Sequence, residues 1–402
     1  MVPKGWEVRN LENLASVERG KFSARPRNDP KYYGGEIPFV QTGDIAGAKT
    51  YLKSYSQTLN EEGLKVSRLF PKDTILITIA ANIGDVAITS FDVACPDSLV
   101  AIQPKEGTNV IWLYFYLETC QKELDGQATQ NAQKNINLQV LRPLEVLTPP
   151  LPEQQKIAKI LSTWDKAIST TERLIENSTQ QKKALMQQLL TGKKRLLDES
   201  GERFEGEWEE VSIGSTSKCF SGGTPSRTKD EYYNGNIPWI TSGKLNDRYV
   251  DSVNEYITEL GLQNSSAKIV KNGSVLVAMY GATAGKVALN MVDGATVNQA
   301  VLALEPKEEF HNMFLFYLLE VEMLKALLLV QGGQPNLSAT IIKAIKIKVP
   351  TYIEQQKIAT VLTNADKEIE LLEQQLADLQ QEKKALMQVL LTGKKRVVVD
   401  EC

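Results

Sequence analysis

The sequence predicts an α+β protein in which two heads of mixed β-sheet and helices alternate with two long helices, related by an internal pseudo-twofold repeat. The first observation is a repeated run: thirteen of the fourteen residues of 182–195 recur in 383–396, at an offset of 201. The second is that residues 153–161 and 354–362 share EQQKIA at the same offset. Such repeats are read first because they decide the architecture. Between the repeated runs the heads share only scattered positions, which predicts two different ligands on one scaffold.

Each head begins near a tryptophan and then carries the pattern of β-hairpins. Trp6 of the first head corresponds to Trp208 of the second. Residues 70–88 and 269–289 each place β-branched and other apolar residues on both sides of a glycine-containing turn, which predicts two strands joined by a hairpin. Apolar stretches of helical character follow in both heads, at residues 111–124 and 313–328. Each head is therefore predicted to combine a mixed β-sheet with helices.

A long helix is predicted after each head. Residues 153–191 contain no proline or glycine, and their seam positions advance in alternating steps of four and three, as in a coiled coil with some polar interruptions. A helix of this length is about 58 Å long at the α-helical rise. Pro152 precedes it, and Gly192 and Gly393 follow the two helices where C-terminal caps are expected. Large residues of one seam correspond to small residues of the other, which favours pairing of the two helices within one chain. Because each helix is followed by a head or by the chain end, an antiparallel coiled coil is the expected geometry.

Composition limits the class of protein. The chain has 402 residues, of which 42% are apolar and 24% charged, as is typical of a folded protein with two or more domains. No apolar stretch reaches the length of a signal peptide or a transmembrane helix, so we expect a cytoplasmic protein without membrane contact. The net charge of −3 argues against nonspecific coating of nucleic acid but allows local basic patches.

Motifs for catalysis or metal binding are absent from the sequence. The four cysteines show no CxxC spacing and His311 is the single histidine, so we expect unpaired thiols and no zinc site. Residues 281–286 (GATAGK) resemble a phosphate-binding loop, but three residues separate the glycines and a valine follows the lysine, which favours a hairpin turn. We therefore expect no catalytic residue and no cofactor in this chain.

Basic residues gather in a loop of the first head, and a related loop occurs in the second. Guanidinium and ammonium groups on such loops can contact phosphates or guanine edges of DNA, whereas the alternative is a solvated surface turn. The candidates are Lys21, Arg25 and Arg27 in the first head and Lys218, Thr224, Ser226 and Arg227 in the second. The matched positions of the two loops strengthen the nucleic-acid interpretation, and both alternatives stay open.

Polar runs ahead of each long helix give a second set of candidates. Asn and Gln side chains donate and accept hydrogen bonds together, which suits an adenine edge in the major groove. Alternatively, these runs are loops that dock the head onto the helix. The candidates are Lys134, Asn135, Gln334 and Asn336, together with Asn82 and Tyr280 in the hairpin turns. Phe39 and Trp239 each follow a proline within a predicted strand and are expected in the core.

Several motifs together resemble the specificity subunits of type I restriction-modification systems. The second head carries the strand IPW from Ile237 and the loop GGTPSR from Gly222, and each head is followed by the helical motifs EQQKIAxxL and KKALMQxLLTGKKR. The resemblance covers nearly the whole chain. The first head departs from it, with Phe39 in place of tryptophan and GKFSAR from Gly20 in place of the loop motif. Its loop is therefore expected to contact DNA differently.

The resemblance implies a domain organisation and a set of partners. Each head is expected to be a target-recognition domain that reads one half of an asymmetric bipartite site in double-stranded DNA, with the coiled coil setting the spacing. Two modification (methyltransferase) subunits and restriction subunits are the implied partners, and the chain itself is expected to be non-catalytic. The implied boundaries are 1–152 and 208–353 for the target-recognition domains, 153–192 and 354–393 for the long helices, and 193–207 for a linker.

Two other functions compete with this interpretation. A coiled-coil scaffold with two protein-binding heads and no affinity for DNA has the same repeat, but the basic loop of the first head disfavours it. A stand-alone nuclease or methyltransferase requires cofactor motifs that the sequence lacks. Binding of the heads to DNA at raised salt would exclude the scaffold. Methylation by the isolated chain would favour the stand-alone enzyme.

Overall fold

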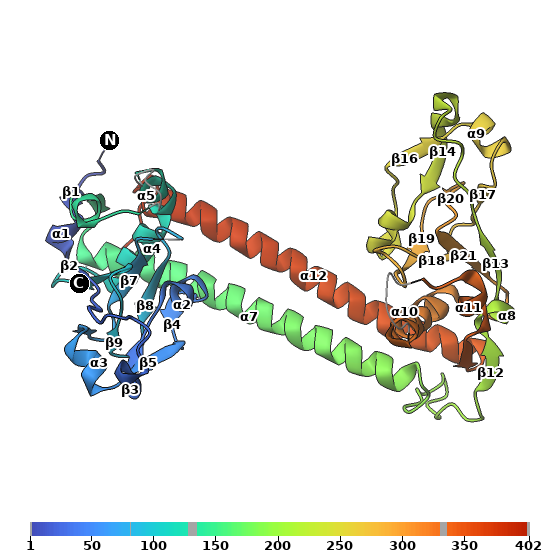
Figure 1. The fold of residues 1–402 in the computed structure, drawn as a ribbon, viewed down its shortest axis with the longest axis horizontal. Helices are drawn as coiled ribbons and strands as arrows, with labels where there is room; N and C mark the ends of the chain where they lie inside the picture. Colours follow the sequence, from blue (N-terminus) through green and yellow to red (C-terminus); the bar gives the residue numbers. More distant parts are fainter. Residues whose placement is uncertain (1, 81, 128–134, 330–335, 400–402) are drawn as a thin grey trace. The chain divides into compact units, whose positions relative to one another are not determined.

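The chain is described by a computed structural model (Figure 1), which covers residues 2–80, 82–127, 135–329 and 336–399. Contacts between residues divide it into two compact units. The first unit comprises residues 1–173 and 373–402, and the second comprises residues 174–372. Each unit therefore contains one head together with one end of both long helices.

A five-stranded sheet forms the centre of the first unit. Its strands lie in the order β2 (Ala15–Arg19), β10 (Leu99–Pro104), β7 (Ile75–Thr78), β8 (Val86–Thr89) and β4 (Tyr51–Leu52). All neighbours are antiparallel except β4, which runs parallel to β8. Successive residues of a strand point to opposite faces, so Ile75 and Ile77 join one apolar core whereas Leu76 joins another. Because both faces are covered, β7 and β8 are buried along their whole length, and each is apolar up to its final threonine.

Two smaller sheets complete the first head. A four-stranded sheet contains β5 (Gln57–Leu59), β3 (Tyr33–Phe39), β9 (Val93–Ala94) and β6 (Leu69–Phe70), in that order. A two-stranded sheet pairs β1 (Glu7–Asn10) with β11 (Glu145–Thr148). The four-stranded sheet has its own aromatic core, in which the rings of Phe22 and Phe39 lie 4.9 Å apart. Phe39 is 1% exposed, which confirms its predicted place in the core.

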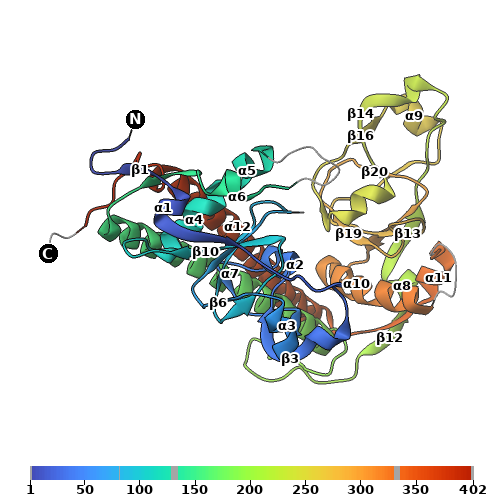
Figure 2. The same cartoon turned by 60° about the vertical axis from the view of Figure 1, so that its left-hand side comes forward.

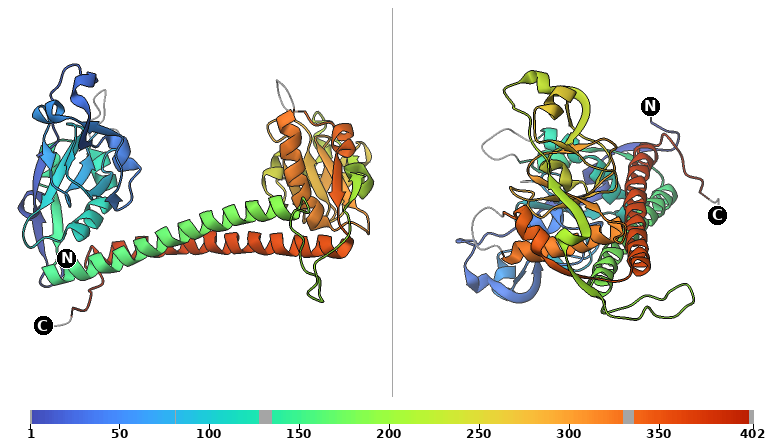
Figure 3. Two further views of the ribbon diagram at one scale, coloured as in Figure 1. Left: turned by 90° about the horizontal axis from the view of Figure 1, so that it is seen from below. Right: turned by 90° about the vertical axis from the view of Figure 1, so that its right-hand side faces the viewer.

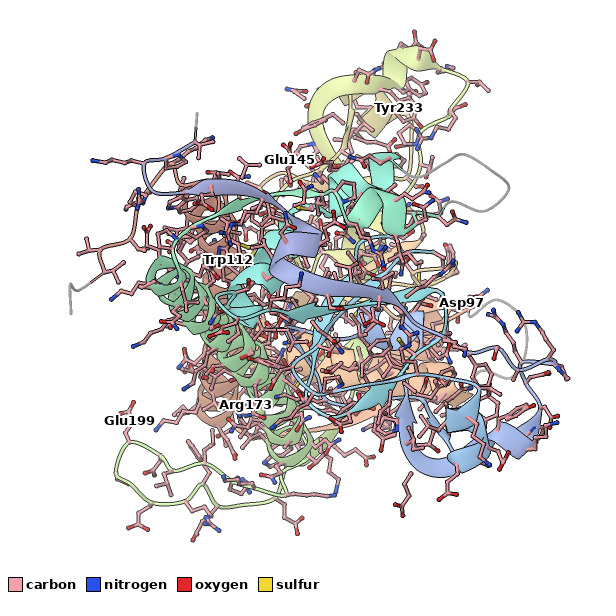
Figure 4. The ribbon with its side chains drawn as sticks, turned by 90° about the vertical axis from the view of Figure 1, so that its left-hand side faces the viewer. Asp97, Trp112, Glu145, Arg173, Glu199 and Tyr233 are labelled. Atoms are coloured by element: carbon pink, nitrogen blue, oxygen red, sulfur yellow. The ribbon has the colours of Figure 1, made fainter. Side chains whose placement is uncertain are left out.

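The first head also contains short helices, which pack on its sheets. They are α1 (Leu11–Leu14), η1 (Pro30–Tyr32), α2 (Thr42–Ala46), α3 (Glu61–Lys65), α4 (Val110–Thr119), α5 (Gln121–Gln127) and α6 (Leu138–Leu141). Trp112 of α4 is fully buried in the core that the sheet shares with the long helices, and Figures 2 and 4 show α4 beside them. The predicted helix 111–124 is thus two helices: the amide of Cys120 bonds the carbonyl of Leu117 three residues back, which tightens the chain and ends α4.

The second unit repeats this architecture. Its central sheet has the order β13 (Ser217–Ser221), β21 (Val301–Pro306), β18 (Val275–Ala278), β19 (Val287–Asn290) and β15 (Tyr249–Val250). Its smaller sheets are β16 (Glu255–Ile257), β14 (Tyr233–Ile240), β20 (Thr296–Val297) and β17 (Lys268–Ile269), and β12 (Glu209–Ser212) with β22 (Lys346–Val349). Its short helices are α8 (Ile213–Thr216), η2 (Asp230–Tyr232), η3 (Ser242–Asn246), α9 (Glu259–Gln263), α10 (Asn312–Leu329) and α11 (Ala339–Ala344).

The two long helices are α7 (Leu151–Leu189) and α12 (Tyr352–Leu390). Pro152 lies in the first turn of α7, where its missing amide hydrogen costs no helical hydrogen bond. In the first unit, Glu153 pairs with Arg396 and Asp165 with Lys383, so the two helices run in opposite directions. The second unit repeats these pairs as Glu354 with Arg195 and Asp366 with Lys182. The antiparallel pairing of the helices, drawn in green and red in Figure 3, is confirmed.

Each head is fixed to its long helix by a glutamine of the EQQ motif. In the first unit, Gln154 accepts a hydrogen bond from the amide of Asn109 at 2.8 Å and donates to the carbonyl of Pro149 at 2.9 Å. Gln355 makes the equivalent bonds to His311 and Pro350 at 2.9 and 3.0 Å. The repeated EQQ sequence therefore encodes a repeated joint between head and helix.

The cysteines and the glycine-containing turn of the second unit agree with the sequence expectations. Cys95, Cys120 and Cys219 are free thiols, as predicted. The run 281–286 lies between the antiparallel strands β18 and β19, so the predicted hairpin turn is confirmed and no helix follows the lysine as it does in a phosphate-binding loop. Within the described part of the chain, no helix is long and apolar enough to cross a membrane.

Candidate nucleic-acid interface

One edge of the central sheet in the first unit collects three connections between strands. Arg19, the last residue of β2, lies opposite Val100, and Thr78, the last residue of β7, lies opposite Leu99. The loop after β2, the turn between β7 and β8 and the turn that precedes β10 therefore emerge at the same edge. We call this set of loops the first loop edge.

The polar run before the long helix reaches the same edge. Asn135 forms an isolated β-bridge with Ala80, and the amide of Ile136 donates to the carbonyl of Ile79 at 3.0 Å. Asn135 and Asn82 thus lie on adjoining segments, and both are exposed. The structure brings together two candidate sets that are more than fifty positions apart in sequence.

The basic loop of the first unit is extended at its start, so its side chains alternate between core and solvent. Gly20 passes so close to the carbonyl of Pro96 that a side chain would overlap it. Phe22 and Ala24 are then buried, whereas Lys21 and Arg25 are exposed. This alternation presents two of the three predicted basic residues to solvent at the first loop edge.

Asp97 holds the third basic residue and was missed by the sequence analysis. Its carboxylate accepts a hydrogen bond from Arg27 at 2.8 Å, and its carbonyl accepts one from Arg19 at 2.5 Å. Figure 4 labels Asp97 at the far end of the blue strand. The run Cys95-Pro96-Asp97 carries the proline and aspartate typical of a turn, but only the sheet register places this turn beside the basic loop.

The second unit forms an equivalent second loop edge. Ser221, the last residue of β13, lies opposite Leu302, and Ala278, the last residue of β18, lies opposite Val301. Tyr280 bridges Asn336, and the amide of Leu337 donates to the carbonyl of Met279 at 2.7 Å. The hairpin turn, the loop after β13 and the polar run therefore meet here as well.

Gln299 links the candidates of the second loop edge, and the sequence analysis also missed it. Its side chain accepts a hydrogen bond from the hydroxyl of Thr224, and its carbonyl accepts one from the hydroxyl of Tyr280 at 2.5 Å. Gln299 occupies the position of Asp97. The amide of Ile79 donates to the carbonyl of Ser98, just after Asp97, and the amide of Met279 donates to the carbonyl of Ala300, just after Gln299. The exposed Gln299 adds an amide side chain to this edge.

Arg227 is held over aromatic rings and faces a carboxylate. Its guanidinium carbon lies 4.8 Å from the ring centre of Tyr233 and 5.0 Å from that of Trp239, and it donates to Glu255 at 2.9 Å. Trp239 is 2% exposed, so its predicted place in the core is confirmed. The side chain of Arg227 remains 57% exposed, which leaves it able to exchange Glu255 for another acceptor.

The remaining predicted residues have different surroundings. Ser226 exchanges a hydrogen bond with Thr228 at 2.9 Å in the same loop. Lys218 lies within β13 rather than in the loop, opposite Glu305, with its ammonium group 3.5 Å from that carboxylate. Its side chain is 75% exposed. Lys134 and Gln334 lie outside the described residues.

The two loop edges therefore present exposed guanidinium, ammonium, amide and hydroxyl groups on a rigid sheet. This set of donors and acceptors matches phosphate oxygens and base edges. Among the described residues, no group of histidine, cysteine and carboxylate side chains is placed to hold a metal ion. Burial lowers the pKa of His311, which belongs to the joint between the second head and α12 and lies away from the loop edge.

Two segments of the chain match a known family model. Residues 3–178 and 205–381 each match the model of the type I restriction modification DNA specificity domain. The chain is 26% identical to the type I restriction enzyme MjaIX specificity subunit of Methanocaldococcus jannaschii, over 98% of this chain and 95% of that protein. It is 29% identical to the EcoR124I/EcoR124II specificity subunit of Escherichia coli, over 63% of each chain.

Solved structures share the fold. The S subunit of a type I restriction-modification system from M. genitalium matches with a TM-score of 0.58 and 17% identity, over 97% of this chain and 96% of that one. A chain from a structure of type I restriction-modification complex assembly matches with a TM-score of 0.62 and 16% identity, over 98% of this chain and 100% of that one. With both halves of its sequence matched by the family model, the chain belongs to the type I restriction modification DNA specificity domain family.

Proposed function

We propose that this chain is the DNA specificity subunit of a type I restriction-modification complex. The observation that carries the proposal is the pair of loop edges. In each unit the family fold gathers a loop with basic residues, a hairpin turn and an asparagine-bearing segment at one end of the central sheet. Loops on a rigid sheet are common sites of recognition because the scaffold fixes their positions.

Each unit is proposed to read one half of a bipartite site in double-stranded DNA. The first loop edge offers Lys21, Arg25 and Arg27, whereas the second offers Thr224, Gln299 and Tyr280. Because the second edge also carries Arg227 but combines it with the neutral groups of Thr224, Gln299 and Tyr280, the side chains of the two edges differ, and the two half-sites are expected to differ in sequence. Cationic side chains suit phosphates and guanine, and amide side chains suit adenine.

The long helices are proposed to set the spacing of the half-sites and to carry the partners. Their repeated faces give two equivalent docking surfaces, which suits two modification subunits, with restriction subunits completing the complex. The chain itself is proposed to be non-catalytic and to act in the cytoplasm. The proposed domains are 1–152 and 208–353, with helices 153–192 and 354–393 and the linker 193–207.

Selection of bound duplexes from a random DNA library tests this function, with the chain purified together with its modification subunit. We expect a split, asymmetric motif with an unread centre. Gln299→Ala is expected to change one half of the motif and Arg27→Ala the other half. The matched control is Arg203→Ala, which lies in the segment between α7 and β12 and belongs to neither loop edge, and is expected to leave both halves unchanged.

A folded complex that enriches no sequence would contradict the proposal and favour a protein-binding scaffold. Changes in both halves from either single variant would contradict the assignment of one half-site to each unit. Methylation by the isolated chain in the presence of S-adenosylmethionine would contradict its non-catalytic role.

A further inference from the structure

The second unit holds a guanidinium group between its head and α12. Arg248, just before β15, donates two hydrogen bonds to Glu320 of α10 at 2.7 and 2.9 Å. It donates a third to Asp366 of α12 at 3.0 Å. The guanidinium carbon also lies near three aromatic rings, 5.8 Å from Tyr249, 5.0 Å from Phe316 and 5.9 Å from Tyr317. Burial opposes the charge, but Glu320 and then Asp366 outweigh it and raise the pKa of Arg248.

The equivalent position in the first unit is Thr50, which has no guanidinium. The equivalence follows from the backbone: the carbonyl of Thr50 accepts from Ile88 at 2.9 Å, and that of Arg248 accepts from Leu289 at 2.9 Å, at the same place in the β4–β8 and β15–β19 pairs. In the head-to-helix joints, Asn109 bonds Gln154 in the first unit and His311 bonds Gln355 in the second, so Asn109 corresponds to His311. Glu118 and Glu320 follow these two residues at the same distance along the sequence and therefore correspond as well. The helix repeat aligns Asp165 with Asp366.

Both carboxylates are retained in the first unit although their arginine is lost. Thr50 donates to Asp165 at 2.8 Å, but Oε2 of Glu118 is buried without a hydrogen-bond partner among the described residues. Lys383 bonds Asp165 at 2.7 Å and stays 3.8 Å from Glu118, as Lys182 bonds Asp366 in the second unit. The second unit thus balances two carboxylates with two cations, and the first has one cation for two carboxylates.

A cavity of about 870 Å³ lies at this place in the first unit. Its lining includes Thr50, Tyr51, Tyr114, Glu118, Asp165 and Lys383. The aromatic residues Tyr51 and Tyr114 occupy the positions of Tyr249 and Phe316, which face the guanidinium of Arg248. Lys49, also in the lining, is already paired with Glu172, and Lys53 and Lys166 are exposed lysines of the rim. The cavity therefore keeps the carboxylates and the aromatic surfaces of the second unit's arginine site.

We propose that this cavity is a guanidinium-binding site that receives the side chain of an arginine from a protein partner. A guanidinium fits better than an ammonium ion or a metal, because Glu118 can accept its parallel N–H groups and the tyrosine rings can face its plane. The internal precedent is Arg248, held by the equivalent groups. The volume exceeds that of one side chain and leaves room for the segment that carries it.

The state of Glu118 supports the assignment. Burial, opposed by Lys383 and reinforced by Asp165, raises the pKa of the Glu118 carboxyl above its usual range. Burial together with the charges of Glu118 and Asp165 also raises the pKa of Tyr114. A cation bound beside Glu118 lowers the pKa of that carboxyl, so binding is expected to release protons in the acidic range.

The test titrates methylguanidinium into the full chain by calorimetry at constant ionic strength, with methylammonium as the matched probe. We expect saturable binding of methylguanidinium to one site and binding of methylammonium about tenfold weaker or undetectable. Glu118→Gln is expected to weaken methylguanidinium binding by about tenfold or more. Thr50→Arg supplies the group from within the chain and is expected to abolish binding and to raise the melting temperature of the first unit.

Arg248→Thr makes the second unit resemble the first and is expected to add a second methylguanidinium site. If this variant does not fold, the Thr50→Arg and Glu118→Gln results still decide the proposal. No saturable binding by the native chain, or equal binding by Glu118→Gln, would overturn it.

A separate arm addresses the source of the arginine, which alone rests on the proposed function. The same titration is made on the complex with the modification subunit, where we expect the site to be occupied and methylguanidinium binding to be lost. Unchanged binding in the complex would overturn the assignment to a partner's arginine. Because no step uses DNA, failure here is distinct from failure of DNA selection.

Discussion

The first and second units use the same strands and helices, but they place charge differently where head meets helix. The second unit closes its joint with Arg248, which pairs with Glu320 and, together with Lys182, with Asp366. The first unit has Thr50 at that position and leaves Glu118 facing a cavity. The comparison shows that the ion pairs of Arg248 are not required for the fold, because apolar packing of both sheet faces is common to both units.

The two loop edges also differ in the charge of their side chains. Asp97 of the first unit holds Arg27 with a carboxylate, whereas Gln299 of the second holds Thr224 with a neutral amide. A position that carries a charge in one copy and an amide in the other changes what the edge offers a ligand without changing the sheet register. The scaffold is thus repeated while its surface chemistry is not.

The largest expected effect concerns the ion pairs at the helix ends. Arg195 binds Glu354 through two hydrogen bonds of 2.6 and 2.7 Å, and the Glu354 side chain is 1% exposed. Arg195→Met is expected to destabilise the second unit by about 3 kcal/mol, because a buried carboxylate loses its counter-ion. Peptide-resolved hydrogen exchange measures the loss within each unit.

The matched control is Arg396→Met, at the equivalent position of the first unit. Arg396 is 41% exposed, and Glu153 keeps a hydrogen bond from Trp6 at 3.2 Å, whereas the indole nitrogen of Trp208 has no hydrogen-bond partner in the part of the chain that the structure describes. We expect a loss of about 1.5 kcal/mol, half that of Arg195→Met. Equal losses would show that exposure and the indole bond are irrelevant.

The next effect concerns DNA binding by the second loop edge. Arg227→Ala is expected to weaken binding, or to relax one position of the second half-site, by about 1 to 3 kcal/mol if the guanidinium reads a base. Binding to the selected duplex and to its single-base variants measures this. Glu255→Gln is the control, since it frees Arg227 from its ion pair and is expected to preserve binding. Equal weakening by both variants would indicate a purely structural arginine.

A smaller effect tests the contrast between Asp97 and Gln299. Asp97→Asn removes a carboxylate from the first loop edge and releases Arg27, so DNA affinity is expected to rise by about 0.5 kcal/mol at low salt. Gln299→Glu places a carboxylate at the second edge and is expected to lower affinity by a similar amount. Titrations at several salt concentrations measure both. Equal salt dependence for native and variant chains would place these positions away from the phosphates.

The smallest effect is the pH dependence of the first unit. The pKa of Glu118 is raised by burial from its ordinary 4.5, so the folded state binds the proton more tightly than the unfolded state. The ionised carboxyl therefore destabilises the fold at neutral pH, and this penalty disappears as pH falls below 4.5. Glu118→Gln is expected to stabilise the first unit at pH 7 by less than about 0.5 kcal/mol, because solvent screens the partly exposed side chain.

Denaturant unfolding at several pH values, followed by hydrogen exchange in each unit, measures this gain. The control is Glu320→Gln, which removes the partner of Arg248 and is expected to destabilise the second unit at pH 7. Burial raises the pKa of Asp366, but the hydrogen bonds from Lys182 and Tyr317 outweigh burial, so the pKa lies below its ordinary value. The stability that ionised Asp366 gives to the second unit is therefore lost only as pH falls through this lowered pKa. A gain from Glu118→Gln that persists below pH 4.5 would contradict the titration of Glu118 as its cause.

The sequence by itself determined the repeat, the two long helices and the two mixed-sheet heads. The heptad steps, the capping glycines and the alternation of apolar strands are local patterns, so they predict elements without knowledge of their neighbours. Pairing of the two helices also followed, from the correspondence between large and small seam residues, and its antiparallel direction followed from the order of heads and helices along the chain. The core positions of Phe39 and Trp239 were predicted from strand pattern in the same way.

Only the tertiary structure decided which distant residues meet. Asp97 and Gln299 lie in short turns with no motif, and sheet register alone brings them beside the loops that carry Arg27 and Thr224. The break of the first helix at Cys120 likewise has no proline or glycine to signal it. The cavity at Thr50 is lined by a strand, a head helix and both long helices, which are far apart in sequence. Such sites arise from the register of pairing and packing, which local sequence patterns do not specify.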